Sequence, residues 1–284
     1  MVLLKGTAVA KDITESVRKR TETFKRKPCL DIIMVGEDPG GLSYVTGAEK
    51  RMEKAGIECR KSMFPADITN DAFQAEFRKI NEDPGVDGII VMMPMPKQID
   101  FQEMAREMKP EKDMDAITEG NRADMYLGAP GIRPCTPEAV IAILDYYHYP
   151  IEGKKATVIG RSLNIGRPVF HMLMDRNATV TVCHSKTSDL AASSRDADIL
   201  VVAIGKAGKI GKNCVKPGAV VLDVGTNVTE EGKLVGDVRF DEVSEVAEAL
   251  TPVPGGVGSV TTSILARHVA DAYEKKEKAA CKAF

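Results

Sequence analysis

The sequence lacks an excess of charge of either sign. Of its 284 residues, 39 are Lys or Arg and 41 are Asp or Glu, so the formal net charge is −2. Proteins whose main task is to bind nucleic acid or an anionic membrane surface carry a marked basic excess. The balance therefore argues against a nucleic-acid-binding protein and against a polybasic membrane-surface protein.

Long apolar runs are also missing. No window holds about eighteen uninterrupted apolar residues, which is the length that spans a bilayer. The first residues, Met1 to Lys11, have no apolar core behind a basic start, as a secretory signal peptide would. We therefore expect a cytoplasmic protein with no membrane-spanning segment.

The cysteines form no metal-binding pattern. None of them belongs to a C-x-x-C pair or a Cys/His cluster, which argues against a zinc site. We expect reduced thiols, as is usual in a cytosolic protein. The six are Cys29, Cys59, Cys135, Cys183, Cys214 and Cys281.

The length suggests about two domains, at roughly 100–200 residues each. In the first half, an apolar helix face runs through Val9, Ile13, Val17 and Phe24. Strand and helix patterns then alternate, which predicts a parallel sheet. The expected strands cover residues 30–35, 57–64 and 86–93, and the expected helices cover residues 43–55 and 72–80.

A second α/β half follows a stretch rich in proline and glycine, from Pro94 to Pro137. Long loops of this kind usually serve a function, so a site or a domain junction is predicted there. After a helix at residues 138–147, strands are expected at 156–159, 178–183, 199–203 and 219–223. A last helix runs to about Lys275, and its solvated end continues to Lys282. The fold class is α/β, with two domains that each contain a parallel sheet.

The first strand of the second half leads into a glycine-bearing turn, Gly160 to Gly166, and then into a helix. This order is typical of a Rossmann-type dinucleotide-binding domain. Glycine lets the backbone approach a pyrophosphate, whose charge the helix N-terminus favours. The pattern is G-x-S-x-x-x-G rather than G-x-G-x-x-G, so a simple tight link between strand and helix is the alternative interpretation.

Two residues near this turn indicate which dinucleotide binds. Arg161 follows the first glycine, and Ser185 lies just beyond the next strand, where an acidic residue would hold the ribose hydroxyls of NAD. Arg and Ser suit a 2′-phosphate instead, through charge-assisted hydrogen bonds. The sequence therefore favours NADP over NAD, and the structural alternative is a surface Arg and a helix-capping Ser.

The chain resembles the bifunctional methylenetetrahydrofolate dehydrogenase/methenyltetrahydrofolate cyclohydrolase family over nearly its whole length. The motifs that carry the resemblance occur in the family's order and at similar spacing. They are Tyr44-Val45, residues 87–91, Pro94-Met95-Pro96, Lys112-Asp113-Met114-Asp115, residues 133–137, residues 158–162, residues 178–181, residues 183–187, Asp223-Val224-Gly225, Gly236-Asp237-Val238 and residues 251–258.

The resemblance implies a fold and a set of ligands. Residues 1–137 and the C-terminal helix 260–284 would form the folate-binding catalytic domain, and residues 138–259 a Rossmann-type NADP-binding domain. The family implies a tetrahydrofolate derivative as substrate, bound in a cleft between the domains, and a homodimer with no nucleic-acid or membrane partner.

The resemblance also implies roles for individual residues. Tyr44 would stack on the folate and Asp115 would hydrogen-bond the pterin, and these two are the catalytic candidates. A packing role for Tyr44 and a turn-capping role for Asp115 are the structural alternatives. Further folate contacts would come from Val91, Met92, Pro254, Gly255, Gly256, Val257 and Gly258, and cofactor contacts from Gly160, Arg161, Ser162, Ser185 and Thr226.

The sequence departs from the family pattern at positions that bear on chemistry. The family lysine four residues after the tyrosine is Ala48, and the family glutamine is Met92. Lys50 does not replace the lysine, because two helical positions turn a side chain by about 200°. The other departures are Gly41 for serine, Ala116 for glycine, Thr226 for isoleucine, and Ser259 and Val260 for proline and methionine.

These departures affect the two family reactions differently. Hydride transfer needs aligned reactants and no protein base, whereas ring hydrolysis needs proton transfers for which a lysine is suited. We therefore predict an NADP-dependent dehydrogenase with weak or absent cyclohydrolase activity. The alternatives are the full bifunctional enzyme, a non-catalytic folate- or nucleotide-binding paralogue, and a dehydrogenase with another substrate.

Overall fold

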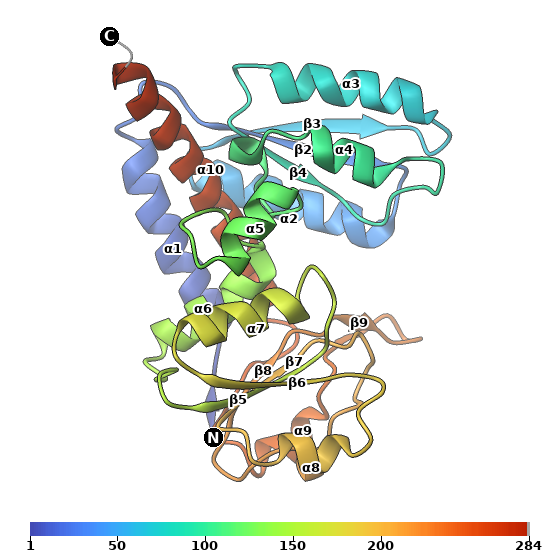
Figure 1. The fold of residues 1–284 in the computed structure, drawn as a ribbon, viewed down its shortest axis with the longest axis vertical. Helices are drawn as coiled ribbons and strands as arrows, with labels where there is room; N and C mark the ends of the chain where they lie inside the picture. The colour runs from blue at the N-terminus through green and yellow to red at the C-terminus, as the bar shows by residue number, and fades with distance from the viewer. Residues whose placement is uncertain (283–284) are drawn as a thin grey trace. The chain divides into compact units, whose positions relative to one another are not determined.

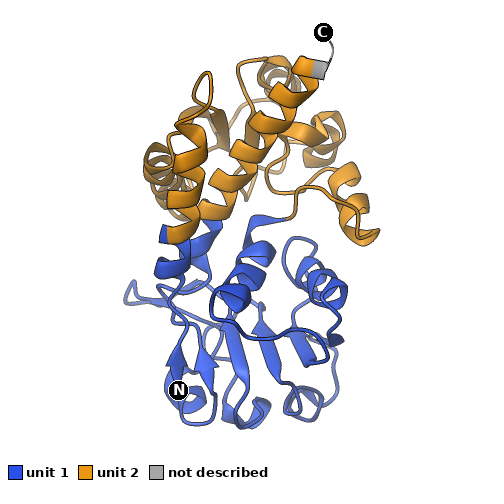
Figure 2. Ribbon diagram, turned by 90° about the vertical axis from the view of Figure 1, so that its left-hand side faces the viewer, with its two compact units in different colours: residues 1–11, 134–261 blue, residues 12–133, 262–284 orange. Residues whose placement is uncertain are grey.

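The computed structural model describes residues 1–282, which divide into two compact units (Figure 2). Unit 1 contains residues 1–11 and 134–261, and unit 2 contains residues 12–133 and the chain from Thr262 onward. The sequence prediction gave residues 1–137 and 260–284 to one domain, of which 283–284 lie outside the described residues. The units divide the chain differently at its start, because residues 2–3 pair with the sheet of unit 1.

Unit 1 is built on a six-stranded sheet in which every strand pair is parallel (Figure 1). In spatial order the strands are β1 (Val2–Leu3), β11 (Ala249–Leu250), β8 (Val220–Asp223), β7 (Ile199–Val202), β5 (Lys155–Ile159) and β6 (Thr179–Cys183). The chain leaves β5 for β6 on one side and then crosses to β7 on the other. The carboxyl ends of β5 and β7 therefore form a topological switch point, where open α/β sheets bind their ligands.

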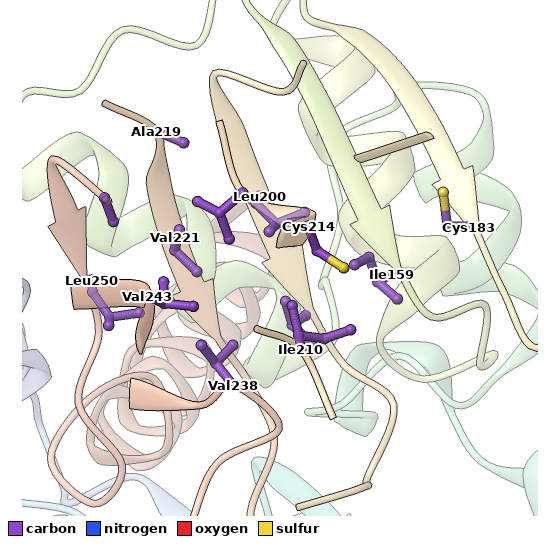
Figure 3. Packing of buried hydrophobic residues seen from close by; sticks show 13 residues of the cluster. Ile159, Cys183, Leu200, Ile210, Cys214, Ala219, Val221, Val238, Val243 and Leu250 are labelled. Atoms are coloured by element: carbon purple, nitrogen blue, oxygen red, sulfur yellow. The ribbon is translucent and has the colours of Figure 1, made fainter. Parts of the chain in front are cut away.

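Helices cover both faces of this sheet (Figure 1). On one side lie α6 (Cys135–Tyr146) and α7 (Gly166–Asp175), and on the other α8 (Leu190–Ser194) and α9 (Phe240–Ser244). The face toward α8 and α9 buries alternate strand residues such as Leu200, Val221 and Leu250 (Figure 3). The short helix η2 (Lys212–Cys214) and an antiparallel hairpin of β9 (Asn227–Val228) and β10 (Leu234–Val235) complete the unit.

Unit 2 holds a smaller parallel sheet, in the order β3 (Glu58–Phe64), β2 (Cys29–Val35) and β4 (Gly88–Val91). The central strand β2 is buried along its whole length, as expected for a parallel strand covered on both faces, and all of its residues except Asp31 are apolar. Phe73 and Phe77 of α3 (Asn70–Glu82) pack with Met104 of α4 (Phe101–Glu107) on one face of the sheet. The opposite face is flanked by α2 (Pro39–Lys54), whose first turn is capped by the Asp38 carboxylate accepting from Gly41 N at 2.7 Å.

The stretch from Pro94 to Pro137 is less irregular than its prolines and glycines predict. It contains α4, a short helix η1 (Pro110–Lys112) and α5 (Glu119–Tyr126), and α6 begins at Cys135. Side chains cap two of these helices, because Asp100 accepts from Glu103 N and Thr118 accepts from Asn121 N. Helices this short have too little apolar periodicity to stand out in the sequence.

Three findings concern the chain as far as residue 282. No helix in that range combines the length and apolar character needed to cross a membrane. The cysteines there are all free thiols, and only Cys281 is exposed. No group of three or more His, Cys, Asp and Glu side chains within residues 1–282 is arranged to hold a metal ion.

Candidate active site

The turn between β5 and α7 can be made only by glycine at two positions. Gly160 has a φ of +135°, and a Cβ there would lie 2.2 Å from the carbonyl oxygen of Ala203, which follows β7. A Cβ on Gly166 would lie 2.3 Å from the carbonyl oxygen of Gly160. The strand end and the helix start are thus packed backbone to backbone, as a close approach to a pyrophosphate requires.

The hydroxyl of Ser162 completes this turn. Its Oγ accepts from the backbone N–H of Ile165 at 3.2 Å and of Gly166 at 3.3 Å, and so caps the first turn of α7. The sequence prediction gave Ser162 a cofactor contact, and the structure gives its oxygen a capping role within the turn. The hydroxyl hydrogen is still available to donate to a ligand.

Arg161 and Ser185 lie at the same edge of the sheet. Ile159 of β5 is in register with Cys183 of β6, and each of the two site residues comes two positions after its strand partner. Both side chains are exposed, and Arg161 forms no hydrogen bond or ion pair with another residue between 1 and 282. The arrangement therefore presents a guanidinium and a hydroxyl next to the glycine turn.

Two buried carboxylates, Asp223 and Asp237, accept hydrogen bonds from the loops that follow β8 and β7. Asp223 ends β8 and accepts from the N–H groups of Gly225 and Asp237 at 3.0 Å and of Val238 at 2.9 Å. Burial raises the pKa of Asp223 to about 6, although these three bonds act in the opposite direction. Asp237 is 0% exposed and holds the adjacent loops. Thr226 lies between them in sequence and is exposed, as a cofactor contact would need.

The segment from Pro254 to Gly258 packs tightly within unit 1. The peptide bond before Pro254 is cis, Gly255 has a φ of +102°, and its carbonyl accepts from Gly6 N at 2.9 Å. A Cβ on Gly256 would lie 2.4 Å from the carbonyl oxygen of Pro252. The glycines therefore shape a fixed loop before α10 (Gly258–Lys282), in which Pro254 and Gly258 are exposed and Val257 is buried.

In unit 2, helix α2 carries the candidate stacking residue and the position of the missing lysine. Tyr44 is half-buried, and Ala48, one turn later on the same face, is 0% exposed. Lys50 is exposed, in line with its different helical direction. A Cβ on Gly41, where the family has serine, would lie 2.9 Å from Met34 Cε, so the methionine side chain would have to move.

The end of β4 places the next pair of candidates. Val91 is the last residue of the strand, and Met92 continues its ladder by donating its N–H to Ile33 O at 2.8 Å. Both side chains are half-buried, and a cis peptide bond joins Met93 to Pro94. The thioether of Met92 has no proton to give, unlike the glutamine amide that the family has there.

Asp115 lies in a loop that is held from both sides. The buried carboxylate of Asp113 accepts from the loop's N–H groups, and the carbonyl of Met114 is 3.0 Å from Nδ1 of His268 on α10. Asp115 itself is half-buried, and Ala116 after it has a φ of +52°. Residues 113 and 268 were given no role from the sequence, because their partners are fixed only by the fold.

Replacement of Ala116 by glycine is expected to stabilise unit 2 by about 1 kcal/mol. A side chain in the left-handed region costs roughly 1–2 kcal/mol, and part of the gain is lost to the greater freedom of glycine in the unfolded chain. Thermal unfolding should show Tm higher by about 2–4 °C. The control is Ala123→Gly in the regular helix α5, where Ala123 is exposed and the same exchange should destabilise. A lower Tm for Ala116→Gly would contradict the strain argument.

A parallel sheet with a glycine-closed turn at its switch point defines unit 1 as a Rossmann-type dinucleotide-binding fold. Comparison with known proteins covers both halves of the chain. The family model "Tetrahydrofolate dehydrogenase/cyclohydrolase, catalytic domain" matches residues 4–115, and "Tetrahydrofolate dehydrogenase/cyclohydrolase, NAD(P)-binding domain" matches residues 134–277. The chain belongs to the tetrahydrofolate dehydrogenase/cyclohydrolase family.

Individual relatives cover nearly the full length. The chain is 46% identical to the bifunctional protein FolD of Alkaliphilus oremlandii, over 94% of this chain and 95% of the relative. The solved FolD methylenetetrahydrofolate dehydrogenase/cyclohydrolase of Campylobacter jejuni has a TM-score of 0.95 at 37% identity, covering 97% and 99% of the two chains. The Trypanosoma brucei enzyme, solved with NADP cofactor and an inhibitor, has a TM-score of 0.92 at 34% identity, covering 97% and 98%.

Proposed function

We propose that this chain is an NADP-dependent methylenetetrahydrofolate dehydrogenase with little or no cyclohydrolase activity. The observation that carries the proposal is a contrast between two sets of residues. The dinucleotide turn is complete, with Gly160 and Gly166 packed against backbone, while the acid–base positions hold Ala48 and Met92. The residues for hydride transfer are therefore present, and the usual residues for proton transfer are absent.

The residues fit a bound NADP. A Cβ at Gly160 or Gly166 would collide with backbone, so only glycine allows the tight turn that precedes α7, and Arg161 and Ser185 offer donors to a 2′-phosphate. NADP, when bound, supplies the hydride acceptor. Tyr44 stacks on the folate, and Asp115 holds the pterin by a hydrogen bond. Orientation is the main contribution of the chain, and well-aligned reactants are worth about 7–11 kcal/mol of the barrier.

The cyclohydrolase reaction makes other demands. Water adds to the methenyl carbon and the ring then opens, so protons must be delivered and removed at defined atoms. A side chain that does this contributes about 10²–10⁴-fold. Ala48 and Met92 can neither donate nor accept a proton in this way. The full bifunctional enzyme is the second candidate, because the relatives that match over the whole length carry bifunctional names.

Parallel assays of the pure protein decide between these candidates. One reaction contains methylenetetrahydrofolate with NADP or NAD, and the other contains methenyltetrahydrofolate without nucleotide, corrected for uncatalysed hydrolysis. Dehydrogenase activity alone supports the proposal. Activity in both reactions means that another group replaces the lysine and that the chain is bifunctional. Inactivity in both, with folate still bound, indicates a non-catalytic paralogue.

Arg161→Ala is expected to weaken the binding of NADP far more than the binding of NAD. The exposed guanidinium has no partner among residues 1–282, so its loss removes a charge-assisted bond to the 2′-phosphate without disturbing the turn. Such a bond is worth roughly 1.5–3 kcal/mol, or about 10–150-fold in KM for NADP. Arg167→Ala, at an exposed position within α7, is the control. Equal effects of Arg161→Ala on the two cofactors would remove the assignment to a 2′-phosphate.

The remaining assignments also belong to the proposal. The folate-binding residues are Tyr44, Val91, Met92 and Asp115, and residues 254–258 are further folate-binding candidates. Unit 1 carries the NADP-binding residues. The protein acts in the cytoplasm as a homodimer. Sedimentation that shows only a monomer at assay concentrations would exclude the dimer.

A further inference from the structure

Two buried aspartates, one in each unit, share the same hydrogen-bonding arrangement. Asp113 is 1% exposed and Asp237 is 0% exposed. Each carboxylate accepts four hydrogen bonds, three from backbone N–H groups of one loop and one from an asparagine side chain. Within residues 1–282, neither forms an ion pair with a Lys, Arg or His. The charge of each aspartate is therefore balanced by oriented dipoles alone.

In unit 2, Asp113 gathers the loop that carries Asp115. Its Oδ1 accepts from the N–H of Asp115 at 3.3 Å and of Ile117 at 3.0 Å. Its Oδ2 accepts from the N–H of Thr118 at 2.8 Å and from Nδ2 of Asn121 at 3.0 Å. The backbone from residue 115 to the start of α5 thus surrounds the carboxylate. These hydrogen bonds fix the backbone position of Asp115.

In unit 1, Asp237 gathers the loop that follows β7. Its Oδ2 accepts from the N–H of Ile204 at 2.7 Å and of Gly205 at 3.0 Å, and its Oδ1 accepts from the N–H of Lys206 at 2.7 Å. Three successive N–H groups that converge in this way form a nest, a shape that binds anions. The chain fills this nest with its own side chain, so the nest fixes the loop.

The fourth bond of Asp237 extends this control to the next loop. Nδ2 of Asn227 donates to Oδ1 at 2.9 Å, directly after Thr226. The β7 loop begins next to the glycine turn, because Ala203 O lies 2.2 Å from the position that a Cβ on Gly160 would occupy. Asp237 therefore holds the β7 loop beside the glycine turn and, through Asn227, also holds the β8 loop.

A carboxylate offers about four lone-pair sites, and each of these two uses all four inside the protein. Neither has an acceptor site left for a ligand. Each aspartate instead fixes the position of its loop. Its hydrogen bonds are stronger than those between neutral groups, because the acceptor is charged. We propose that Asp113 and Asp237 are a pair of positioning residues, Asp113 for the folate-binding loop of unit 2 and Asp237 for the dinucleotide-binding loops of unit 1. This inference rests on the proposed function.

The test is a crossed comparison of Asp113→Asn and Asp237→Asn. Asparagine keeps the shape but presents an NH₂ group to two N–H donors, so each loop loses two of its bonds. For Asp237→Asn we expect the KM and Kd for NADP to rise about 10-fold or more, with the KM for methylenetetrahydrofolate within about 2-fold. Asp113→Asn should show the reverse. Fluorescence titration with NADPH measures cofactor binding independently of turnover.

Three further variants keep the test decisive if an aspartate variant fails to fold. Asn121→Ala and Asn227→Ala each remove one of the four bonds and should give the same crossed pattern at smaller size. Asp198→Asn is the matched control. Asp198 lies at the amino end of β7 and accepts from Lys155 N at 3.0 Å and Lys216 Nζ at 2.6 Å, so its change should lower Tm and leave both ligand constants unaltered.

The outcomes separate this inference from the function on which it rests. A wild-type protein that neither binds NADPH nor oxidises methylenetetrahydrofolate overturns the proposed function. An active wild type whose two aspartate variants shift both ligand constants equally, or shift neither, overturns the positioning roles while the function stands. The crossed pattern supports both.

Discussion

Gly160→Ala is expected to lower kcat/KM for NADP by about 10²-fold or more and to destabilise unit 1. The new Cβ would lie 2.2 Å from the Ala203 carbonyl oxygen, and φ at this position is +135°. The obstructing atom is backbone, so no side chain can rotate away. The turn itself must shift, and a shift of about 1 Å at a binding site costs on the order of 100-fold in rate. Strain and overpacking add roughly 2–4 kcal/mol against folding.

Gly218→Ala provides the matched control for this prediction. Gly218 has a φ of +82°, precedes β8, and has no atom within 4 Å of its Cβ position. Gly218→Ala therefore has the conformational cost of a side chain at positive φ but no steric clash, and Gly218 lies at the other end of the sheet. Chemical denaturation should show a loss of about 1 kcal/mol, with NADP kinetics unchanged. If Gly160→Ala kept the wild-type KM and kcat for NADP, the turn would not be the pyrophosphate site.

Ala48→Lys combined with Met92→Gln is expected to raise cyclohydrolase activity by about 10²–10⁴-fold. This is the usual contribution of a placed acid–base group, and Ala48 is one turn after Tyr44 on the same face of α2. Because position 48 is 0% exposed, burial should lower the pKa of the introduced lysine toward neutrality. Hydrolysis of methenyltetrahydrofolate, followed by absorbance, measures the gain.

Gly47→Lys tests whether the position of the charge matters. Position 47 is the preceding residue of α2, is exposed, and has open space around its Cβ. It adds the same charge to the same helix and should add no cyclohydrolase activity. Ala48→Lys alone should give part of the gain, because glutamine would then be missing as its partner. If the folded double variant hydrolyses methenyltetrahydrofolate at the wild-type rate, residues 48 and 92 do not determine the cyclohydrolase activity of this chain.

Local sequence was enough to predict the glycine turn between β5 and α7. The apolar strand, the glycines at 160 and 166 and the following helix are contiguous in the sequence. Arg161 and Ser185 could be placed for the same reason, since each directly follows a predicted strand. The family resemblance predicted the two-domain α/β fold, which the family models and the sheets confirm.

The positioning carboxylates lay beyond such reasoning. Asp237 accepts from residues 31 to 33 positions earlier in the chain, and nothing in Gly236-Asp237-Val238 indicates which loop it holds. The two-residue strands β1 and β11 are too short for any periodicity. The helices between Pro94 and Pro137 were hidden by their length. For the carboxylates and the two-residue strands, the missing information was a partner distant in sequence.

The pairing of β1 with β11 has a consequence for how the chain is made. β1 is made 247 residues before its partner, because Val2 pairs with Ala249, and unit 2 likewise awaits α10 for its last helix. Neither unit can close its core on the ribosome until these later segments have emerged. Domain-by-domain folding during translation, the usual order for a two-domain protein, is thereby replaced by completion of both units only after β11 and α10 have been made.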